Sequence, residues 1–338
     1  MDTLYFSFVI PVYNRPDEVE ELLDSFTLLK GDFSFEIVIV EDGSTISCKS
    51  VIDKFSKALN ISYFYKPNSG PGDSRNYGMS RAKGNYFIIL DSDCLVPPEY
   101  LITVSSYLKS NYTDCFGGPD TAHSSFSNLQ KAINFAMTSF ITTGGIRGGK
   151  SSGDKFQPRS FNMGLSKTAF EASKGFGCIH PGEDPDLSIR LNNLGFKTLL
   201  VNDAFVFHKR RISWSKFYTQ VHKFGLVRPI LNTWHPETRR LAYWFPTVFS
   251  VGFLLAIVLY SFYGNHLLLS LYIVYIIIAF CLSFAVNGHL TIAFQSIVAI
   301  FIQFFGYGYG FLMSTLAITV MKKKPEKHFP QLFFNDVK

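Results

Sequence analysis

Apolar runs alternate with amphipathic stretches along the first 110 residues of the chain. The short runs predict strands: FSFVIPV (6–12), FEIVIV (35–40), ISYFY (61–65) and NYFIIL (85–90). The stretches between them carry apolar residues at helical spacing and predict helices: PDEVEELLDSFTLL (16–29), KSVIDKFSKAL (49–59) and DSRNYGMSRAK (73–83). Alternation of this kind predicts an α/β fold, with a mostly parallel, doubly wound sheet that is covered by helices on both faces.

The hydrophobic pattern changes completely in the last third of the chain. From Leu241 to Val320 there is no Asp, Glu, Lys or Arg. Three stretches in this region, 243–263, 266–286 and 290–320, are each long enough to cross about 30 Å of hydrocarbon as a helix. A buried helical core is the alternative, but helices of a soluble core still show polar faces. The sequence therefore predicts a helical membrane region.

Basic residues flank this region on both sides, with Arg239 and Arg240 before it and Lys322 to Lys324 after it. The positive-inside tendency places both flanks in the cytoplasm, which requires an even number of crossings. The third stretch contains FFGYGYGFL, whose three glycines we expect to break it, so that it lies flat or re-enters. Two or three spans are therefore predicted.

The start of the chain has no basic segment before its apolar residues, so we expect no signal peptide and the first 240 residues in the cytoplasm. Five cysteines without a CxxC spacing are typical of reduced thiols. The predicted location is the cell inner membrane, as a multi-pass protein. The stretch SWSKFYTQVHKFGLVRPILNTWHP interleaves aromatic and basic residues and predicts an interfacial helix. The net charge of +6 does not indicate nucleic-acid binding, because the basic residues gather beside the membrane segments.

Acidic residues stand where two of the predicted strands end. Asp42 follows FEIVIV, and Asp91 and Asp93 follow NYFIIL in the sequence LDSD. Ligands of such sheets bind at the carboxyl ends of the strands. Asp42 suits the imide N–H of a base or a ribose hydroxyl, and the D-x-D pair suits a sugar hydroxyl and Mn²⁺ or Mg²⁺. Each motif is also an ordinary turn sequence.

The stretch SGPGDSRNYG places glycines before a predicted helix and Arg75 and Asn76 in its first turn. Backbone N–H groups and a guanidinium at a helix start suit a diphosphate. The stretch lacks both the Gly-Lys-Ser/Thr of phosphate loops and the G-x-G-x-x-G of dinucleotide sites.

The ordered set IPVYN, EDGS, SGPGDSRNYG and LDSD resembles the family 2 glycosyltransferases of the GT-A fold, over about residues 5 to 210. This resemblance implies an inverting transferase that uses a nucleotide-diphosphate sugar and Mn²⁺ or Mg²⁺. It implies two metal contacts, Asp93 and His208, although a lone His is also a common structural residue. The donor-binding residues it implies are Pro11, Tyr13, Asn14, Asp42, Arg75, Asn76, Asp91 and Ser92.

The second half of the predicted domain supplies the acceptor side of the resemblance. Glu183 and Asp184 stand at the entry of a predicted helix, where acidic residues also simply complement the helix dipole. In the family such a pair faces the acceptor, so Asp184 is the expected general base and Glu183 the second choice. Asn162, expected on a loop before a short strand, and Arg159 are the expected acceptor-side residues.

These features divide the chain into a GT-A catalytic domain (1–210), an interfacial linker helix (211–240), transmembrane helices (241–321) and a basic tail (322–338). The leading hypothesis is a membrane-anchored transferase that moves a sugar to a lipid-linked or membrane-held glycan, in polysaccharide or glycoconjugate synthesis. A polyprenyl-phosphate sugar synthase is the alternative, which the long segment 118–180 disfavours. A non-catalytic scaffold with a nucleotide-binding fold is disfavoured because all the expected acidic residues are present: Asp42, Asp91, Asp93, Glu183 and Asp184.

Overall fold

The computed structural model describes residues 4–121, 126–144, 156–208 and 213–334. They form two compact units. The first, called the α/β unit here, contains 4–121, 156–208 and 333–334; the second, the helical unit, contains 126–144 and 213–332. Residues 126–144 thus belong to the helical unit, although they lie in sequence inside the predicted catalytic domain.

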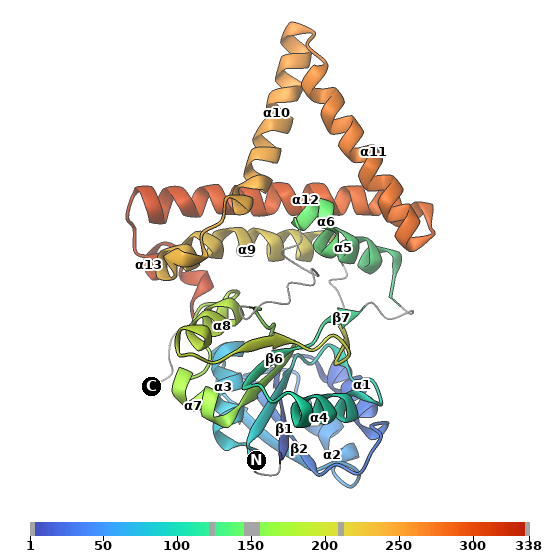
Figure 1. Cartoon of the computed structure of the whole chain (residues 1–338), viewed down its shortest axis with the longest axis vertical. Coiled ribbons are helices and arrows are strands. Elements are labelled where there is room, and N and C mark those ends of the chain that lie inside the picture. Colours follow the sequence, from blue (N-terminus) through green and yellow to red (C-terminus); the bar gives the residue numbers. More distant parts are fainter. Residues whose placement is uncertain (1–3, 122–125, 145–155, 209–212, 335–338) are drawn as a thin grey trace. The chain divides into compact units, whose positions relative to one another are not determined.

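A seven-stranded sheet forms the centre of the α/β unit, with the strand order β3-β2-β1-β4-β8-β6-β9 (Figure 1). The pairs β3/β2, β2/β1, β1/β4 and β6/β9 are parallel, and β8 is antiparallel to both of its neighbours. The strands are β1 (Phe6–Val12), β2 (Phe35–Asp42), β3 (Ile61–Lys66), β4 (Tyr86–Leu90), β6 (Cys115–Gly117), β8 (Asn162–Ser166) and β9 (Thr198–Leu200). The mostly parallel α/β sheet predicted from the sequence is confirmed.

Helices cover both faces of this sheet because successive strand residues point to opposite sides. In β1, Phe8 and Ile10 pack on one face and Val9 on the other. The first face carries α1 (Pro16–Thr27), α2 (Lys49–Phe55) and α4 (Tyr100–Ser110). The second carries α3 (Pro71–Arg81), α7 (Lys167–Ser173) and α8 (Glu183–Asn193). On that face Gly78 lets α3 approach the sheet, since a Cβ there would lie 2.6 Å from Val9 Cγ1.

A smaller three-stranded sheet lies beside the ends of the main strands, in the order β5-β10-β7. Its strands are β5 (Cys94–Leu95), β7 (Asp120–Thr121) and β10 (Val206–His208). β10 pairs antiparallel with β5, and the register places His208 opposite Cys94. This short pairing joins two parts of the chain that are more than a hundred residues apart in sequence.

The helical unit contains the apolar helices. They are α10 (Phe245–Tyr263), α11 (Leu267–Asn287) and α12 (Leu290–Ser314), and α12 continues as a π-helix over Thr315–Val320. The segments 241–263, 267–287 and 290–320 are long and apolar enough to cross a membrane, close to the predicted stretches. Figure 1 shows α10 and α11 as the arms of a hairpin, with α12 running across its base.

A helix was expected within 211–240, and α9 (Trp214–Trp234) occupies this region and packs along α12 within the helical unit. Glycines set the closeness of this packing. A Cβ on Gly225 would lie 2.2 Å from the Tyr307 carbonyl oxygen, and one on Gly310 would lie 2.5 Å from that of His222. The expectation that FFGYGYGFL breaks the third segment is wrong, because these glycines sit within an unbroken α12 and serve helix contact.

The remaining described elements are short. Among them, α5 (Asn128–Thr138) joins the core of the helical unit through Ile133 and Ala136. The others are α6 (Phe140–Thr143), α13 (Pro325–His328) and 3-10 turns at Pro236–Thr238, Leu241–Trp244 and Pro330–Leu332.

Candidate active site

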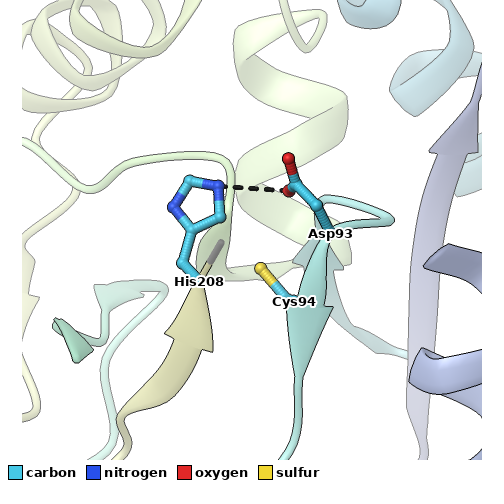
Figure 2. A group of neighbouring side chains, drawn as sticks. All are labelled: Asp93, Cys94 and His208. Carbon is cyan, nitrogen blue, oxygen red and sulfur yellow. Dashed lines mark ion pairs between the residues drawn. The ribbon is translucent and has the colours of Figure 1, made fainter. Parts of the chain in front are cut away.

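The turn after β4 brings Asp93 to His208. Because β10 pairs with β5, the His208 ring stands beside the Asp93 carboxylate, with 3.1 Å between Nε2 and Oδ1 (Figure 2). The second carboxylate oxygen, Oδ2, lies 2.9 Å from Nη1 of Arg15. Asp93 is 8% exposed, so it stands at the edge of the protein interior with an imidazole and a guanidinium around it. The two residues expected to hold a metal are therefore neighbours.

Ligand atoms of Asp93, Cys94 and His208 all lie within 4.8 Å of one another. The Cys94 thiol does not fit a hard cation, because burial, and then the charge of Asp93, raise its pKa, and its Sγ donates to the Phe161 carbonyl at 3.4 Å. The carboxylate fits Mn²⁺ or Mg²⁺, whereas the imidazole beside it suits the softer Mn²⁺ better than Mg²⁺. Asp120 lies on the other side of the ring, with 3.9 Å between its Oδ2 and Nδ1 of His208.

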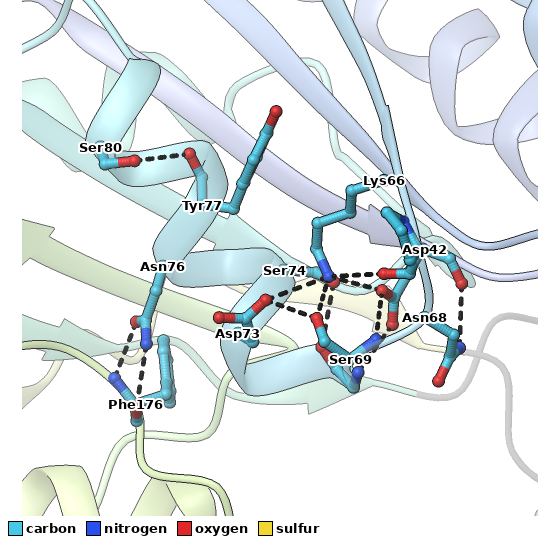
Figure 3. A network of polar contacts seen from close by, with 12 residues as sticks. Asp42, Lys66, Asn68, Ser69, Asp73, Ser74, Asn76, Tyr77, Ser80 and Phe176 are labelled. Atoms are coloured by element: carbon cyan, nitrogen blue, oxygen red, sulfur yellow. Dashed lines mark hydrogen bonds and ion pairs between the residues drawn. The ribbon is translucent and has the colours of Figure 1, made fainter. Parts of the chain in front are cut away.

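Hydrogen bonds to Asp42 hold the loop that leads into α3 (Figure 3). Its Oδ1 accepts from Lys66 Nζ at 2.6 Å and from the Ser69 N–H at 2.9 Å, and its Oδ2 accepts from the Gly70 N–H at 2.9 Å. Asp42 is 4% exposed. Both oxygens are thus already engaged, so in this structure Asp42 shapes the wall of the expected donor site.

Arg75 and Asn76, which were expected to meet a diphosphate, are held by partners within the α/β unit. The Arg75 side chain is buried and lies between two carboxylates, 2.8 Å from Asp91 Oδ1 and 3.1 Å from Glu183 Oε1. The Asn76 amide donates to the Phe176 carbonyl and accepts from the Phe176 N–H. Arg75 therefore joins the turn after β4 to the first turn of α8, and Asn76 fixes the chain before that helix.

Glu183 and Asp184 differ in their surroundings. Glu183 is 4% exposed; burial works against its charge, but His180 at 2.9 Å and Arg75 lower its pKa. For Asp184, burial and the charge of Glu183 raise the pKa to about 6, against the opposing effect of Arg75 and Arg159. Asp184 Oδ1 is buried and has no hydrogen-bond partner among the described residues. Asp184 is thus the carboxyl group of the pair that can take up a proton near neutral pH.

The other expected donor residues lie at the same edge of the sheet. The Tyr13 side chain is 52% exposed just after β1, and Pro11 is partly exposed within the strand. Asn14 has a φ of 55°, and its side chain accepts from the Thr45 N–H at 2.8 Å, which holds the turn after β2. Ser92 is 5% exposed. Of these residues, only Tyr13 offers a largely open side chain.

Asn162 and Arg159 were expected on the acceptor side. Asn162 instead begins β8 and is fully buried, donating to the Ala204 carbonyl at 2.7 Å and accepting from the Tyr100 hydroxyl at 2.6 Å. The expected loop position is therefore wrong, and its amide serves to join strand, helix and loop. Arg159 is partly exposed and lowers the pKa of Asp184, so it stands near the expected base.

The sequence-based interpretation did not single out several charged residues of this region. Arg15 directly follows the IPVYN motif, and Lys66 ends the ISYFY strand. A lysine in an otherwise apolar strand needs a buried partner, which is a signal that would have pointed to Asp42. Asp120 carried no such local signal, because its partner His208 lies on a distant strand, whereas His180 stands only three residues before its partner Glu183.

Known proteins resemble this chain in sequence and in fold. The model of the family described as Glycosyl transferase family 2 matches residues 7–171. The poly(ribitol-phosphate) beta-N-acetylglucosaminyltransferase TarS of Staphylococcus aureus is 32% identical over 114 residues, which are 32% of this chain and 20% of that protein. The poly(ribitol-phosphate) beta-glucosyltransferase of Bacillus spizizenii is 36% identical over 114 residues, or 32% of this chain and 18% of that protein.

Among solved structures, the mannosyltransferase PcManGT from Pyrobaculum calidifontis, in complex with GDP-Man and Mn²⁺, has the same fold. Its TM-score is 0.60 at 14% sequence identity, and the match covers 91% of this chain and 86% of that one. This chain spans about a fifth of the length of the two curated relatives. Residues 7–171 of this chain therefore match a family 2 glycosyltransferase domain, and the α/β unit that contains most of them has the GT-A fold.

Proposed function

We propose that this protein is a membrane-anchored, metal-dependent, inverting glycosyltransferase that moves a sugar from a nucleotide-diphosphate donor to a lipid-linked or membrane-held glycan. The observation that carries the proposal is the position of Arg75. It links Asp91, next to the expected metal site, to Glu183, next to the expected base. Donor and acceptor chemistry would therefore meet around one buried cation.

The donor would bind at the edge where β1, β2 and β4 end. Asp93 and His208 would hold Mn²⁺ or Mg²⁺, which supplies positive charge to the leaving diphosphate. Arg15, 2.9 Å from Asp93, adds a guanidinium at the same place. The Tyr13 ring is open for stacking on the base. The Mn²⁺ in the complex of the mannosyltransferase PcManGT is consistent with such a metal.

Asp184 would act as the general base. As the acceptor hydroxyl oxygen attacks the anomeric carbon, its proton passes to the Asp184 carboxylate, and the bond between that carbon and the diphosphate breaks. One displacement of this kind inverts the configuration at the anomeric carbon. A pKa of about 6 leaves Asp184 largely ionised at neutral pH and still basic enough to accept the proton.

The helical unit suggests where the acceptor is found. Its apolar segments expose many large side chains, among them Phe262, Leu271 and Phe294. Such a surface requires lipid around it. The names of both curated relatives give poly(ribitol phosphate) as acceptor, which favours a glycan or polyol polymer here too. We further propose that α10 and α11 cross the membrane and that α12 lies with α9 at its surface, so that both basic flanks face the cytoplasm.

The test uses the full-length protein in detergent with a panel of nucleotide-diphosphate sugars, Mn²⁺ and membrane-lipid extract. Release of the nucleoside diphosphate and the mass of the product are measured. We expect Asp93→Ala to abolish transfer and Asp184→Asn to lower it by at least about 100-fold, with only Asp93→Ala losing the Mn²⁺-dependent thermal shift with nucleotide. Asp203→Asn, an exposed acidic change, is the matched control. Full activity of both variants would overturn the proposal, and a sugar joined directly to a lipid monophosphate would identify a polyprenyl-phosphate sugar synthase instead.

A further inference from the structure

Two residues that follow the helical unit in sequence belong to the α/β unit. Phe333 forms an antiparallel bridge with Ile179, and the Phe334 N–H donates to the Cys178 carbonyl at 2.9 Å. The chain from α7 to α8 has no helix or strand of its own among the described elements. Residues 333–334, called the returning segment here, therefore give this connection a backbone partner.

The Phe334 side chain faces the loop that precedes α3. A Cβ on Gly70 would lie 2.3 Å from the Phe334 ring, so the ring rests directly on the Gly70 backbone. Its centroid is also 6.1 Å from that of His180. Phe334 lines a pocket there together with Asp73, Asn76 and Cys178. The ring thus lies between the loop held by Asp42 and the connection that leads to α8.

The connection carries a residue that the active site needs. His180 follows the bridged Ile179 directly, and its Nδ1 lies 2.9 Å from Glu183 Oε1. The same oxygen of Glu183 lies 3.1 Å from Arg75 Nη1. Ile179 is 1% exposed, so the connection is anchored on one side by its own side chain and on the other by the returning segment.

We propose that Phe333 and Phe334 are positioning residues for sugar transfer. By pairing with Cys178 and Ile179 they hold His180 against Glu183, and thereby fix the first turn of α8, which carries Asp184. This inference rests on the proposed function, since it assigns the returning segment a role in that reaction. A physical consequence is that the base is held partly by residues from beyond the membrane helices.

The test compares two changes at one position in the full-length protein, each made in a Cys281→Ser background. Phe334→Pro removes both the ring and the N–H that bonds Cys178, whereas Phe334→Ala removes the ring alone. Phe262→Ala, at a side chain 79% exposed in the helical unit, is the control for loss of a phenyl ring. Cys178 and Cys281 are exposed and the other three cysteines are buried, so a maleimide reports on Cys178.

We expect Phe334→Pro to speed maleimide labelling of Cys178 several-fold and to lower kcat by about 10- to 100-fold, with Phe334→Ala intermediate. The acid limb of the pH–rate profile should also move to lower pH. Water that enters beside Asp184 weakens the effect of burial, while Glu183, Arg75 and Arg159 still face it. A lower kcat with an unchanged KM for the donor would show that the variant affects the position of the base and not the binding of the donor.

Each other outcome has a definite meaning. Faster labelling with an unchanged kcat and pH profile would overturn the positioning role, and unchanged labelling would overturn the contact itself. A wild-type protein without transferase activity would refute the proposed function, while the labelling rates would still test the contact. The conservative change Phe334→Leu should restore most of the activity if an apolar side chain and an N–H suffice.

Discussion

Replacing Arg75 with Met tests how the structure holds its charged centre. The methionine fills most of the volume but leaves Glu183, whose side chain is 5% exposed, with His180 as its remaining partner. Asp91 also loses a partner, but its side chain is 32% exposed and water can replace the guanidinium. The partly exposed Asp91 thus contributes little, and most of the loss in the free energy of unfolding comes from Glu183. Removing one partner of a buried ion pair lowers the free energy of unfolding by about 3–5 kcal/mol.

The lower end of this range, about 3 kcal/mol, is expected because His180 remains beside Glu183. For a unit of this size, that corresponds to a fall in Tm of about 6–12 °C. The fall in Tm caused by Arg75→Met should depend on pH. The folded protein lowers the pKa of Glu183, so its contribution to stability is present above the unfolded pKa and is lost as the pH falls through the folded pKa. The Tm difference should thus narrow below about pH 4.3.

The assay is thermal unfolding of the 338-residue chain in detergent between pH 3 and pH 8, for wild type and variant. Arg81→Met is the matched control, since Arg81 lies on the same helix, is exposed, and contacts the Tyr77 ring at 3.3 Å. We expect Arg81→Met to lower the free energy of unfolding by less than about 1 kcal/mol. Equal losses of Tm for the two variants, or a Tm difference between wild type and Arg75→Met that stays constant down to pH 3, would refute the reasoning.

Three further predictions concern the base, the donor loop and the helical unit. Asp184→Asn should lower kcat by about 10²–10⁴-fold, and the wild-type rate should rise with pH through about 6 as Asp184 ionises; stopped assays across pH 5–8 measure both. Lys66→Met removes the buried partner of Asp42 and should weaken nucleotide binding and lower the Tm, as calorimetry and thermal unfolding would show. Gly225→Ala should destabilise the helical unit by about 1–3 kcal/mol, although Ala is the better helix former, because its Cβ meets the Tyr307 backbone; a raised Tm would contradict this packing.

Local pattern alone determined much of this protein. The runs 6–12 and 35–40 became β1 and most of β2, because apolar residues bounded by turns form buried strands wherever they meet a sheet. The apolar stretches after residue 240 became long helices for a similar reason, since no polar face interrupts them. Asp42, Asp91 and Asp93 could be placed at one edge because parallel strands end together there.

The tertiary structure decided which charged groups meet. Nothing near Arg75 in sequence indicates that its guanidinium contacts both Asp91 and Glu183. The sequence suggested a diphosphate as its partner. The register of β10 against β5 places His208 at Asp93, and a shift by one residue would turn its side chain to the other face. The contact of Phe334 with Cys178 joins two residues that are separated in sequence by residues 213–332 of the helical unit. Sequence periodicity reports which face of an element is buried, whereas these pairings arise only when distant elements pack together.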